Sequence, residues 1–496
     1  MILCDQLCAG TLEIFGGPVR TPNLARIASR GVAFEAAYCQ APICSPSRAS
    51  ILTGRYPHTH GLVGNVFRLD YPAIGGPDAE EGIDSRDITT EGLLAAAGYD
   101  TRYVGKWHVS GEIPACYTSM YREHQEYAAE MKDFFYKVES GPRENYVDWY
   151  GWKLPVLVGK AFKDAVEHIP EKWQQARLHD FYSKIGILDM PIEQTYDDRI
   201  AVRCIEAIRQ AKPPFMLTCS FNMPHDPNVV PARYYDAVDP AKIIADVTRP
   251  CEEIYQHDLS REIPFHAGNR FLQEFLRVYE ASIMMVDDEV GRILAALEEK
   301  GVEQDTVILF TSDHGDMAGG HGMFWKSTSS FYDEITRVPL LVSAPGCPRG
   351  IRYAKPVELV DLMPTILELC GAACPAGLDG ESLVTALLGK DAQKQLAICE
   401  RLVPAPGNRR IRRDHDRWSS FMLRYGNYKY VIHHKKEMKA RLMYDLENDP
   451  HEYRNLIGQP ESMAVETSLQ EILQQRLATC GYTLDEHSFA GGVPTW

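Results

Sequence analysis

Hydrophobic residues along the first two-thirds of the chain alternate between short continuous runs and longer stretches with helical spacing. The runs are typical of strands buried on both faces of a sheet, and the stretches are typical of amphipathic helices. This alternation predicts an α/β fold, a large and mostly parallel sheet covered by helices on both sides. The expected strands are residues 1–4, 32–38, 101–104, 215–221, 306–311 and 340–343, and the expected helices are residues 21–31, 45–53, 90–97, 271–300 and 361–369.

Local residues mark where several of these helices begin and end. Thr21 is expected to cap one helix, with Pro22 in its first turn and Gly31 at its end. The long helix over residues 271–300 ends before Gly301, and its pattern allows a break near Ile283.

Two regions depart from this alternation. Residues 110–195 are irregular and rich in aromatic side chains, which indicates an insertion that covers a neighbouring surface. After about residue 389 the chain changes to short strands, and these predict a smaller α+β domain with an antiparallel sheet. We therefore expect one large domain over residues 1–388 and a smaller one over residues 389–496. The short strands are residues 421–423, 428–432 and 442–446, and the aromatic residues are Tyr117, Tyr121, Phe134, Phe135, Tyr136, Tyr146, Trp149, Tyr150 and Trp152.

Composition narrows the class of protein. The 496 residues are 45% hydrophobic and 24% charged, which is ordinary for globular proteins and excludes collagen-like, disordered and coiled-coil chains. The formal net charge of −16 argues against nucleic acid as the main partner, because phosphate binding requires a positive field. No apolar run reaches the roughly 18 residues that a membrane span requires, so no membrane partner is expected.

Cysteine usage and the start of the chain bear on the cellular compartment. Thirteen scattered cysteines do not resemble a disulfide framework, so reduced thiols are expected. No secretory signal is visible, but Met1 lies inside an expected strand, as it would in a shortened chain. The localisation therefore stays open between the cytoplasm and the periplasm.

The residues around Cys44 form the most specific chemical pattern in the chain. Cys44 stands where a helix is expected to begin, and Arg48 follows one turn later on the same side. The unpaired amides and the dipole of a helix N-terminus stabilise an anionic oxygen or thiolate. The alternative is a buried cysteine that merely precedes a helix. The whole string of residues 42–54, PICSPSRASILTG, resembles the main signature of the type I sulfatases, in which this cysteine is oxidised to formylglycine.

Further segments extend this resemblance over almost the whole chain, and they lie where strands are expected to end. Open α/β sheets bind their ligands at the carboxyl ends of strands. Residues 98–108 resemble the second sulfatase signature, and residues 444–456 match the tail of the family. The other matching residues are Asp5-Gln6, Lys106 and His108 in the second signature, His225, residues 311–316 with Asp313 and His314, and then His321 and Lys326.

The resemblance implies an alkaline-phosphatase-like hydrolase of sulfate monoesters that uses one divalent cation. Calcium is the cation expected most, with manganese or magnesium as alternatives. The implied ligands are Asp5, Gln6, Asp313 and His314, together with an oxygen of the oxidised Cys44. Carboxylate oxygens suit a hard cation, whereas a single imidazole is less typical for calcium. The enzyme that oxidises Cys44 is the expected transient protein partner, and a homo-oligomer stays open.

The basic residues of the motifs have implied catalytic roles. A sulfate ester is an anion, so its site must concentrate positive charge away from water. Arg48, Lys106 and Lys326 are expected to supply this charge, with His225 protonating the leaving alcohol and His108 assisting the second hydroxyl of hydrated formylglycine. Taken singly, these residues could be surface charges, helix caps or core histidines, but together they supply complementary chemistry.

The pair Asp5-Gln6 departs from the common family pattern of two consecutive aspartates. It resembles choline sulfatases and the phosphonate monoester hydrolases of the same superfamily, so hydrolysis of phosphonate monoesters or phosphodiesters is the alternative function. Lys106 and His108 favour sulfate, because the phosphonate branch replaces them. A third hypothesis is a non-catalytic binding protein, which predicts the loss of a pocket residue.

The sequence says less about the alcohol part of the substrate. A carbohydrate or another small organic alcohol is expected, since aromatic side chains stack on sugar rings and aryl groups alike. A basic cluster either binds further anionic groups or is a solvated loop, and four polar residues beside the motifs are candidates for the pocket lining. The cluster is Arg409, Arg410, Arg412 and Arg413, and the candidates are His58, His60, Asn65 and His321, of which His58 and His60 are alternatively surface residues.

Overall fold

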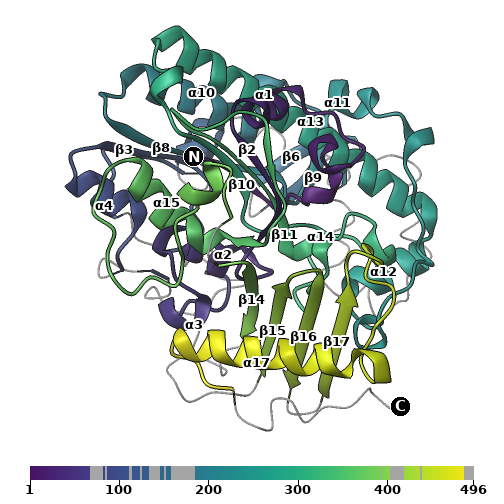
Figure 1. Cartoon of the computed structure of the whole chain (residues 1–496). Helices are drawn as coiled ribbons and strands as arrows, with labels where there is room; N and C mark the ends of the chain where they lie inside the picture. Colours follow the sequence, from purple (N-terminus) through teal and green to yellow (C-terminus); the bar gives the residue numbers. More distant parts are fainter. Residues whose placement is uncertain are drawn as a thin grey trace.

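The structure is a computed structural model, and it describes most of the chain. Its described elements form a large central sheet with helices on both faces and a smaller antiparallel sheet beside it (Figure 1). The described residues are 1–66, 82–83, 87–110, 114–122, 126–132, 146–149, 152–157, 185–391, 394–402, 418–435 and 438–484.

Nine strands of the described residues form the central sheet, in the order β12-β2-β11-β10-β1-β8-β3-β4, with β13 also paired to β2. Strand β11 runs antiparallel to β10 and β2, whereas the remaining pairs are parallel. The predicted strands and the mostly parallel sheet are therefore confirmed. The bounds are β1 Ile2–Asp5, β2 Val32–Tyr38, β3 Asp100–Gly105, β4 Ser119–Tyr121, β8 Phe215–Pro224, β10 Ile308–Ser312, β11 Arg337–Ser343, β12 Ile351–Tyr353 and β13 Val357–Glu358.

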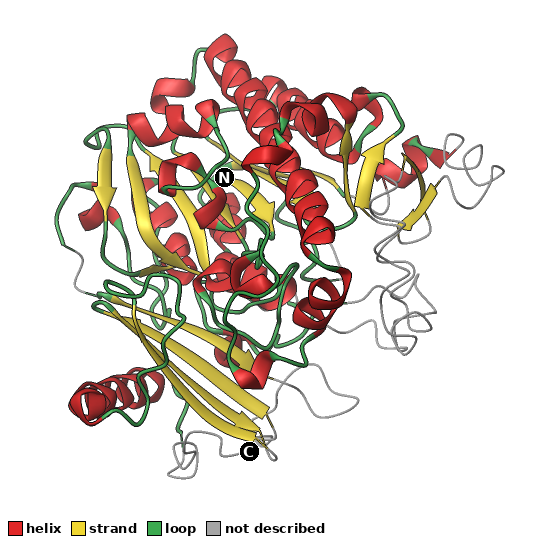
Figure 2. Ribbon diagram, turned by 90° about the vertical axis from the view of Figure 1, so that its right-hand side faces the viewer, coloured by secondary structure: helices red, strands yellow, loops and turns green. Residues whose placement is uncertain are grey.

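Successive residues of the central strands enter two separate hydrophobic cores. Phe310 of β10 joins the core under helices α1, α10 and α13, whereas its neighbour Leu309 joins the core under α2, α4 and α15. Figure 2 shows helices on both sides of the central strands. Burial on both faces is the reason for the continuous apolar runs in the sequence. The bounds are α1 Pro22–Arg30, α2 Cys44–Thr53, α4 Thr90–Ala96, α10 Tyr196–Gln210, α13 Asn269–Lys300 and α15 Leu362–Leu369.

Two local expectations about the helices need correction. Thr21 is the N-cap residue of α1, as predicted, but its side chain makes no capping hydrogen bond. Instead, Asp287 of α13 accepts hydrogen bonds from the main-chain amides of Asn23 (3.1 Å) and Leu24 (2.8 Å). A carboxylate at this end satisfies free amides and the helix dipole. Helix α13 also continues without a break through Ile283, because that residue packs in the first core.

A four-stranded antiparallel sheet, in the order β14-β15-β16-β17, follows the central sheet. Helix α17 lies across one face of it (Figure 1) and packs Leu469 and Leu473 there, whereas Val431 and Leu442 on the other face belong to the second core. The predicted antiparallel sheet is confirmed, β14 was not predicted, and the domain boundary near residue 389 stays a prediction. The bounds are β14 Leu396–Leu402, β15 Trp418–Tyr425, β16 Tyr428–Lys435, β17 Met438–Asp445 and α17 Met463–Thr479.

The aromatic insertion contributes three strands to a third sheet, in the order β5-β6-β7-β9. Strand β7 pairs in parallel with β9, which follows directly after the segment that contains His225. Phe134, Phe135, Tyr136 and Tyr150 lie outside the described residues. The bounds are β5 Tyr146–Trp149, β6 Trp152–Leu157, β7 Ile185–Leu188 and β9 Asn228–Pro231, and the remaining helices are α3 Pro57–His60, α5 Ala128–Glu130, α11 Ala232–Ala237, α12 Leu259–Ala267, α14 Asp333–Thr336 and α16 Val384–Leu387.

Two further properties bear on the cellular setting. All thirteen cysteines lie in the described part of the chain, and each is a free thiol there. Among the described helices, none combines the length and the apolar character that a membrane crossing requires.

Candidate active site

The carboxyl ends of four neighbouring strands meet at one edge of the central sheet, and a motif residue stands at each end. Asp5 ends β1, Lys106 follows β3, His225 follows β8 and Asp313 follows β10. All four side chains are almost completely buried. Buried ionisable groups are rare unless they are paired, so their convergence indicates a built site.

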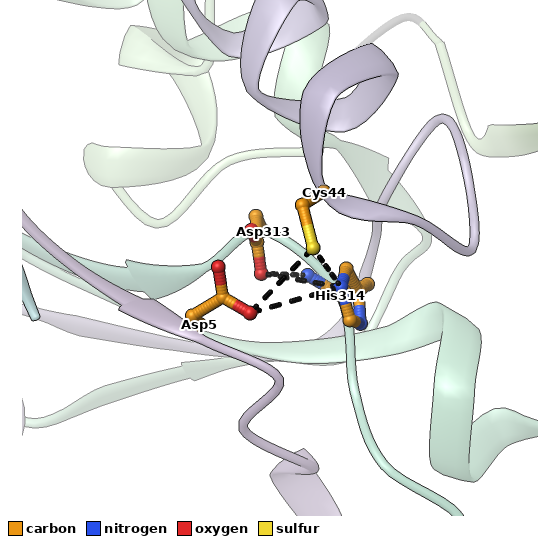
Figure 3. A group of neighbouring side chains, drawn as sticks. All are labelled: Asp5, Cys44, Asp313 and His314. Carbon is orange, nitrogen blue, oxygen red and sulfur yellow. Dashed lines mark hydrogen bonds and ion pairs between the residues drawn. The ribbon is translucent and has the colours of Figure 1, made fainter. Parts of the chain in front are cut away.

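Four of the motif side chains form a compact group (Figure 3). One ligand atom from each of Asp5, Cys44, Asp313 and His314 lies within 4.8 Å of all the others. The Cys44 sulfur is 3.2 Å from His314 Nε2 and 3.7 Å from Asp5 Oδ1. Because all four side chains are fully buried, the group can enclose a single ion away from water.

The ring of His314 is oriented for ligation. Its Nδ1 lies 2.8 Å from the main-chain carbonyl oxygen of Gly315 and donates a hydrogen bond to it. Nε2 therefore faces Cys44 and the carboxylates, and it offers its lone pair to a cation once its own proton is lost. Such a partner on the far nitrogen is the usual way in which a protein fixes a metal-binding histidine.

Gln6 is joined to this group through its main chain, since its amide donates to Asp313 Oδ1 at 3.1 Å. Its Nε2 donates a hydrogen bond to Asp316 Oδ2 at 2.6 Å. Its Oε1 is buried and has no hydrogen-bond partner among the described residues. An unsatisfied buried acceptor costs about 1–3 kcal/mol, which a cation would remove. Two carboxylates, an amide oxygen and one imidazole fit a hard divalent cation, so these residues could hold the metal that the sequence predicts.

The electrostatics of the group also favour a cation. Burial and the nearby Asp5 carboxylate raise the pKa of Asp313. Burial lowers the pKa of the His314 ring, but Asp313 and Cys44 raise it more, to about 9. Both shifts show that the group gains stability from added positive charge.

The Cys44 thiol has a pKa well below its usual value. Burial and Asp5 raise this pKa, but the positive charges of Lys326, Lys106 and His314 together lower it more. The segment that follows α3 contacts the start of α2, because Asn65 Oδ1 accepts a hydrogen bond from the amide of residue 45 at 3.0 Å. Asn65 therefore positions the residue beside Cys44.

Arg48 is buried and binds both carboxylates of the group. Its Nε donates to Asp313 Oδ2 at 2.7 Å and its Nη2 to Asp5 Oδ2 at 2.8 Å. Its Nη1 donates to the Lys106 carbonyl and to Ser220 Oγ, both at 2.8 Å. Four of the five N–H donors of the guanidinium are thus used within the protein. Arg48 mainly fixes the two aspartates, a role that its place in the sequence did not reveal.

The two motif lysines are not solvated surface charges. Lys106 is buried, and its Nζ lies 2.7 Å from Asp5 Oδ2. Lys326 is partly buried, and its Nζ lies 3.6 Å from the Cys44 sulfur and 2.7 Å from His225 Nε2. The far nitrogen of His225, Nδ1, lies 2.7 Å from a main-chain carbonyl oxygen and carries its proton. The Lys326 ammonium therefore contacts both Cys44 and His225, the candidate proton donor.

Three other candidate histidines are His108, His60 and His321. His108 follows β3 with a φ of 52°, in the left-handed region. His60 is hydrogen-bonded to Ser50 Oγ at 3.1 Å. The His321 ring stacks on Tyr332, its Nδ1 donates to a main-chain carbonyl oxygen, and burial lowers its pKa to about 4. The contacts of His60 and His321 are typical of packing rather than of a pocket lining.

His58 is neither a surface residue nor part of the group around Cys44. Its Nδ1 lies 2.5 Å from Glu400 Oε1, and its Nε2 lies 3.2 Å from the carbonyl oxygen of Cys480. Both ring nitrogens face acceptors, an arrangement that favours the doubly protonated imidazolium. This ion pair joins α3 to the first strand of the small sheet and to the end of α17.

The His58–Glu400 ion pair should make stability depend on pH. Burial lowers the pKa of His58, but Glu400 and Asp379 raise it above its ordinary value. A raised native pKa gives a stabilisation that is complete below about pH 6.5 and is lost as the pH rises through the native value. Glu400→Gln should lower the free energy of unfolding by about 1–2 kcal/mol below this range and by less above it, as measured by urea unfolding at a series of pH values.

The exposed Glu381 provides a matched control for this variant. Glu381→Gln should keep the pH profile of the unaltered protein. Equal pH profiles for Glu400→Gln and the unaltered protein would show that His58 is not charged in the native state.

Asp316 and Ser220 also belong to the site, and one predicted cluster lies outside the described residues. Asp316 and Ser220 contact motif residues but were not predicted as part of the site, although Asp316 stands only three positions after Asp313. The cluster Arg409, Arg410, Arg412 and Arg413 lies outside the described residues.

Known proteins match this chain over nearly its whole length. The family model described as Sulfatase matches residues 1–372, and the one described as N-sulphoglucosamine sulphohydrolase, C-terminal, matches residues 319–479. The chain is 26% identical to an ulvan-active sulfatase of Formosa agariphila, covering 100% of this chain and 86% of that protein. It is 28% identical to an arylsulfatase of Clostridium perfringens, covering 100% of this chain and 97% of that protein.

A solved structure supports the fold. The chain superimposes on the phosphonate monoester hydrolase of Silicibacter pomeroyi with a TM-score of 0.76 at 22% identity, covering 99% of this chain and 96% of the other. A likeness at this identity confirms the alkaline-phosphatase-like architecture. The family model matches most of the chain and therefore also establishes the class of reaction. The chain belongs to the sulfatase family and is a sulfuric ester hydrolase.

Proposed function

We propose that the protein hydrolyses a sulfate monoester of a carbohydrate or of another small organic alcohol, with Cys44 oxidised to formylglycine as the nucleophilic residue. The observation that carries this proposal is the position of Cys44 at the start of α2, in one buried group with Asp5, Asp313 and His314. A carbohydrate is favoured because a family model named for an N-sulphoglucosamine sulphohydrolase matches residues 319–479. The enzyme that oxidises Cys44 is the proposed transient partner.

Formylglycine supplies, once hydrated, two hydroxyl groups on one carbon, of which one can attack sulfur and the second can later expel inorganic sulfate. A serine at this position would lack the second hydroxyl and would keep the sulfate. His108 is proposed to accept the proton of the second hydroxyl. The lowered pKa of the Cys44 thiol supports this proposal, because it indicates that the surrounding positive charges stabilise an anion at position 44.

We propose that Asp5, Gln6, Asp313 and His314, with residue 44, hold one divalent cation. Calcium fits the oxygen-rich donor set best, with manganese or magnesium as alternatives. When bound, the cation supplies positive charge that polarises oxygen atoms of the nucleophile and the sulfate.

Three basic residues of the chain are proposed to bind and orient groups around the sulfate. Arg48 keeps Asp5 and Asp313 in place. Among the described residues, four of its five N–H donors have partners, and the fifth can bind the reacting oxygens. The Lys326 ammonium lies beside the nucleophile position and can hold a sulfate oxygen. The Lys326 ammonium donates a hydrogen bond to His225 Nε2, so a proton that passes from Lys326 to this atom can be delivered to the leaving alcohol.

A second candidate activity is the hydrolysis of phosphonate monoesters or phosphodiesters. The observation that favours it is Gln6, which brings a neutral oxygen where many sulfatases carry a second aspartate. The buried Lys106 favours the sulfate reaction, since the resemblance to sulfatases rests partly on this residue.

A panel of esters tests the proposed function. The protein is produced with the maturation enzyme, and oxidation of Cys44 is verified by the mass of the peptide that contains it. We expect release of inorganic sulfate from an aryl sulfate and from at least one sulfated sugar, at a kcat/KM at least about 100-fold above that for aryl phosphonates and phosphodiesters. Choline sulfate is included as a small, non-aromatic sulfate.

Two results of this panel would change the conclusion. Faster hydrolysis of phosphonates or phosphodiesters than of every sulfate would establish the second candidate. No hydrolysis of any ester by fully oxidised protein would contradict the proposed sulfate esters and favour the non-catalytic binding protein.

A further inference from the structure

Gln6 is held in an unusual conformation by three separate contacts. Its φ is 68°, a left-handed value that a side chain other than glycine seldom adopts. Its amide donates to Asp313 Oδ1 at 3.1 Å, and its carbonyl oxygen accepts a hydrogen bond from the Tyr279 hydroxyl at 2.8 Å. Its side-chain Nε2 donates to Asp316 Oδ2 at 2.6 Å. Such strain persists only where the surroundings over-determine it, and it is common at functional sites.

The contact with Asp316 decides which way the Gln6 amide points. Asp316 is fully buried, and its other oxygen, Oδ1, accepts a hydrogen bond from the amide of Ala318 at 2.8 Å. An ionised carboxylate only accepts hydrogen bonds, so Gln6 must present its Nε2 to Asp316. Its Oε1 is then directed elsewhere, and it is the buried oxygen without a partner among the described residues.

We propose that Asp316 is a positioning residue that orients the Gln6 amide oxygen as a neutral ligand for the divalent cation. The inference rests on the proposed function only in that a cation binds beside Asp5, Asp313 and His314. It also gives a physical reason for glutamine at this position. A second carboxylate at position 6 would face the carboxylate of Asp316 with no hydrogen between them.

Two single variants test the hydrogen bond between Gln6 and Asp316, one by changing the acceptor and the other by changing the donor. In Asp316→Asn, the Ala318 amide keeps the remaining oxygen, so the new NH2 group faces Gln6. The Gln6 amide then turns over and directs its own N–H groups at the cation, and the dissociation constant should rise by about 10- to 100-fold. In Gln6→Glu, the added negative charge should not tighten binding, because the new carboxylate and Asp316 repel each other; weaker binding is expected.

The double variant Gln6→Glu/Asp316→Asn restores a donor–acceptor pair with the roles exchanged. The NH2 group at position 316 now donates to the carboxylate at position 6, whose second oxygen is free for the cation. The double variant should therefore bind the cation more tightly than either single variant. This recovery separates positioning from a merely structural role, which would give additive losses.

The measurement is the dissociation constant of Ca²⁺ from metal-free full-length protein, by isothermal titration calorimetry at a pH well above the pKa of Asp316. Burial raises that pKa to about 6. The shift of the thermal midpoint on adding Ca²⁺ is a second readout. Asp287→Asn is the matched control, because Asp287 is also a buried carboxylate that accepts main-chain hydrogen bonds, but at the start of α1. It should lower stability and leave the dissociation constant unchanged.

Two results would overturn the proposal. One is an unchanged Ca²⁺ dissociation constant in Asp316→Asn, and the other is a double variant that binds no better than the weaker single variant. If Asp316→Asn fails to fold, as judged by circular dichroism, the comparison of Gln6→Glu with the double variant decides. Because no readout involves turnover, a failure here is distinct from a failure to hydrolyse sulfate esters.

Discussion

Replacement of Cys44 by alanine is expected to lower kcat/KM for sulfate esters by about four orders of magnitude or more. The methyl side chain can be neither oxidised to an aldehyde nor ionised, so the site loses its nucleophile. The remaining carboxylates, His314 and Lys326 still bind the anion and the cation, so a slow residual reaction is expected. The measurement is the initial rate on an aryl sulfate with protein made in the presence of the maturation enzyme.

A second buried cysteine provides the control for Cys44→Ala. Cys204 on α10 is fully buried but packs in the first hydrophobic core. Cys204→Ala should keep nearly the full rate despite a small loss of stability. A Cys44→Ala protein as active as the unaltered one would show that another group attacks the ester.

Replacement of Arg48 by methionine is expected to lower the free energy of unfolding of the cation-free protein by about 3 kcal/mol or more. Only 2% of the Arg48 side chain is exposed, and its removal leaves the buried Asp313 without its ion-pair partner. Saturating Ca²⁺ should recover part of this loss, because the cation neutralises the same carboxylates. Urea unfolding with a chelator measures the loss of unfolding free energy, and urea unfolding with Ca²⁺ measures how much of it is recovered.

Arg401 is the control for Arg48→Met. It is half-buried, and its hydrogen bonds in the described part of the chain go to main-chain carbonyl oxygens. Arg401→Met should cost less, about 1 kcal/mol, and equally with and without Ca²⁺. If Arg48→Met shows no dependence on Ca²⁺, then Arg48 does not share its carboxylates with a cation.

The central sheet could be predicted because its strands are buried on both faces. Such strands are uninterrupted apolar runs, as in β8 and β10, and they stand out in a sequence. Strand β14 was missed because Glu400 and Arg401 interrupt its apolar run. Glu400 can be buried in that strand because it pairs with His58, which lies 342 residues earlier in the chain.

The helix ends were less predictable, because distant groups can replace local signals. Thr21 is the N-cap residue of α1, as the sequence predicts, but the carboxylate of Asp287 from α13 accepts the hydrogen bonds of the free amides. A charged acceptor stabilises free amides more than a hydroxyl does. Local pattern alone cannot weigh a residue that is 263 positions away.

The sequence by itself determined the chemical groups of the site: Cys44, Asp5, Asp313, Lys106 and their neighbours occur in strings that end strands, and parallel strands bring such ends to one edge. Only the tertiary structure decided which atoms of these groups meet. It directs Nε2 of His314 at the sulfur of Cys44 and, within the described part of the chain, gives the side-chain oxygen of Gln6 no hydrogen-bond partner. It also divides the donors of Arg48 between two carboxylates. These choices depend on distances of a few ångströms between residues hundreds of positions apart, and no local pattern encodes such distances.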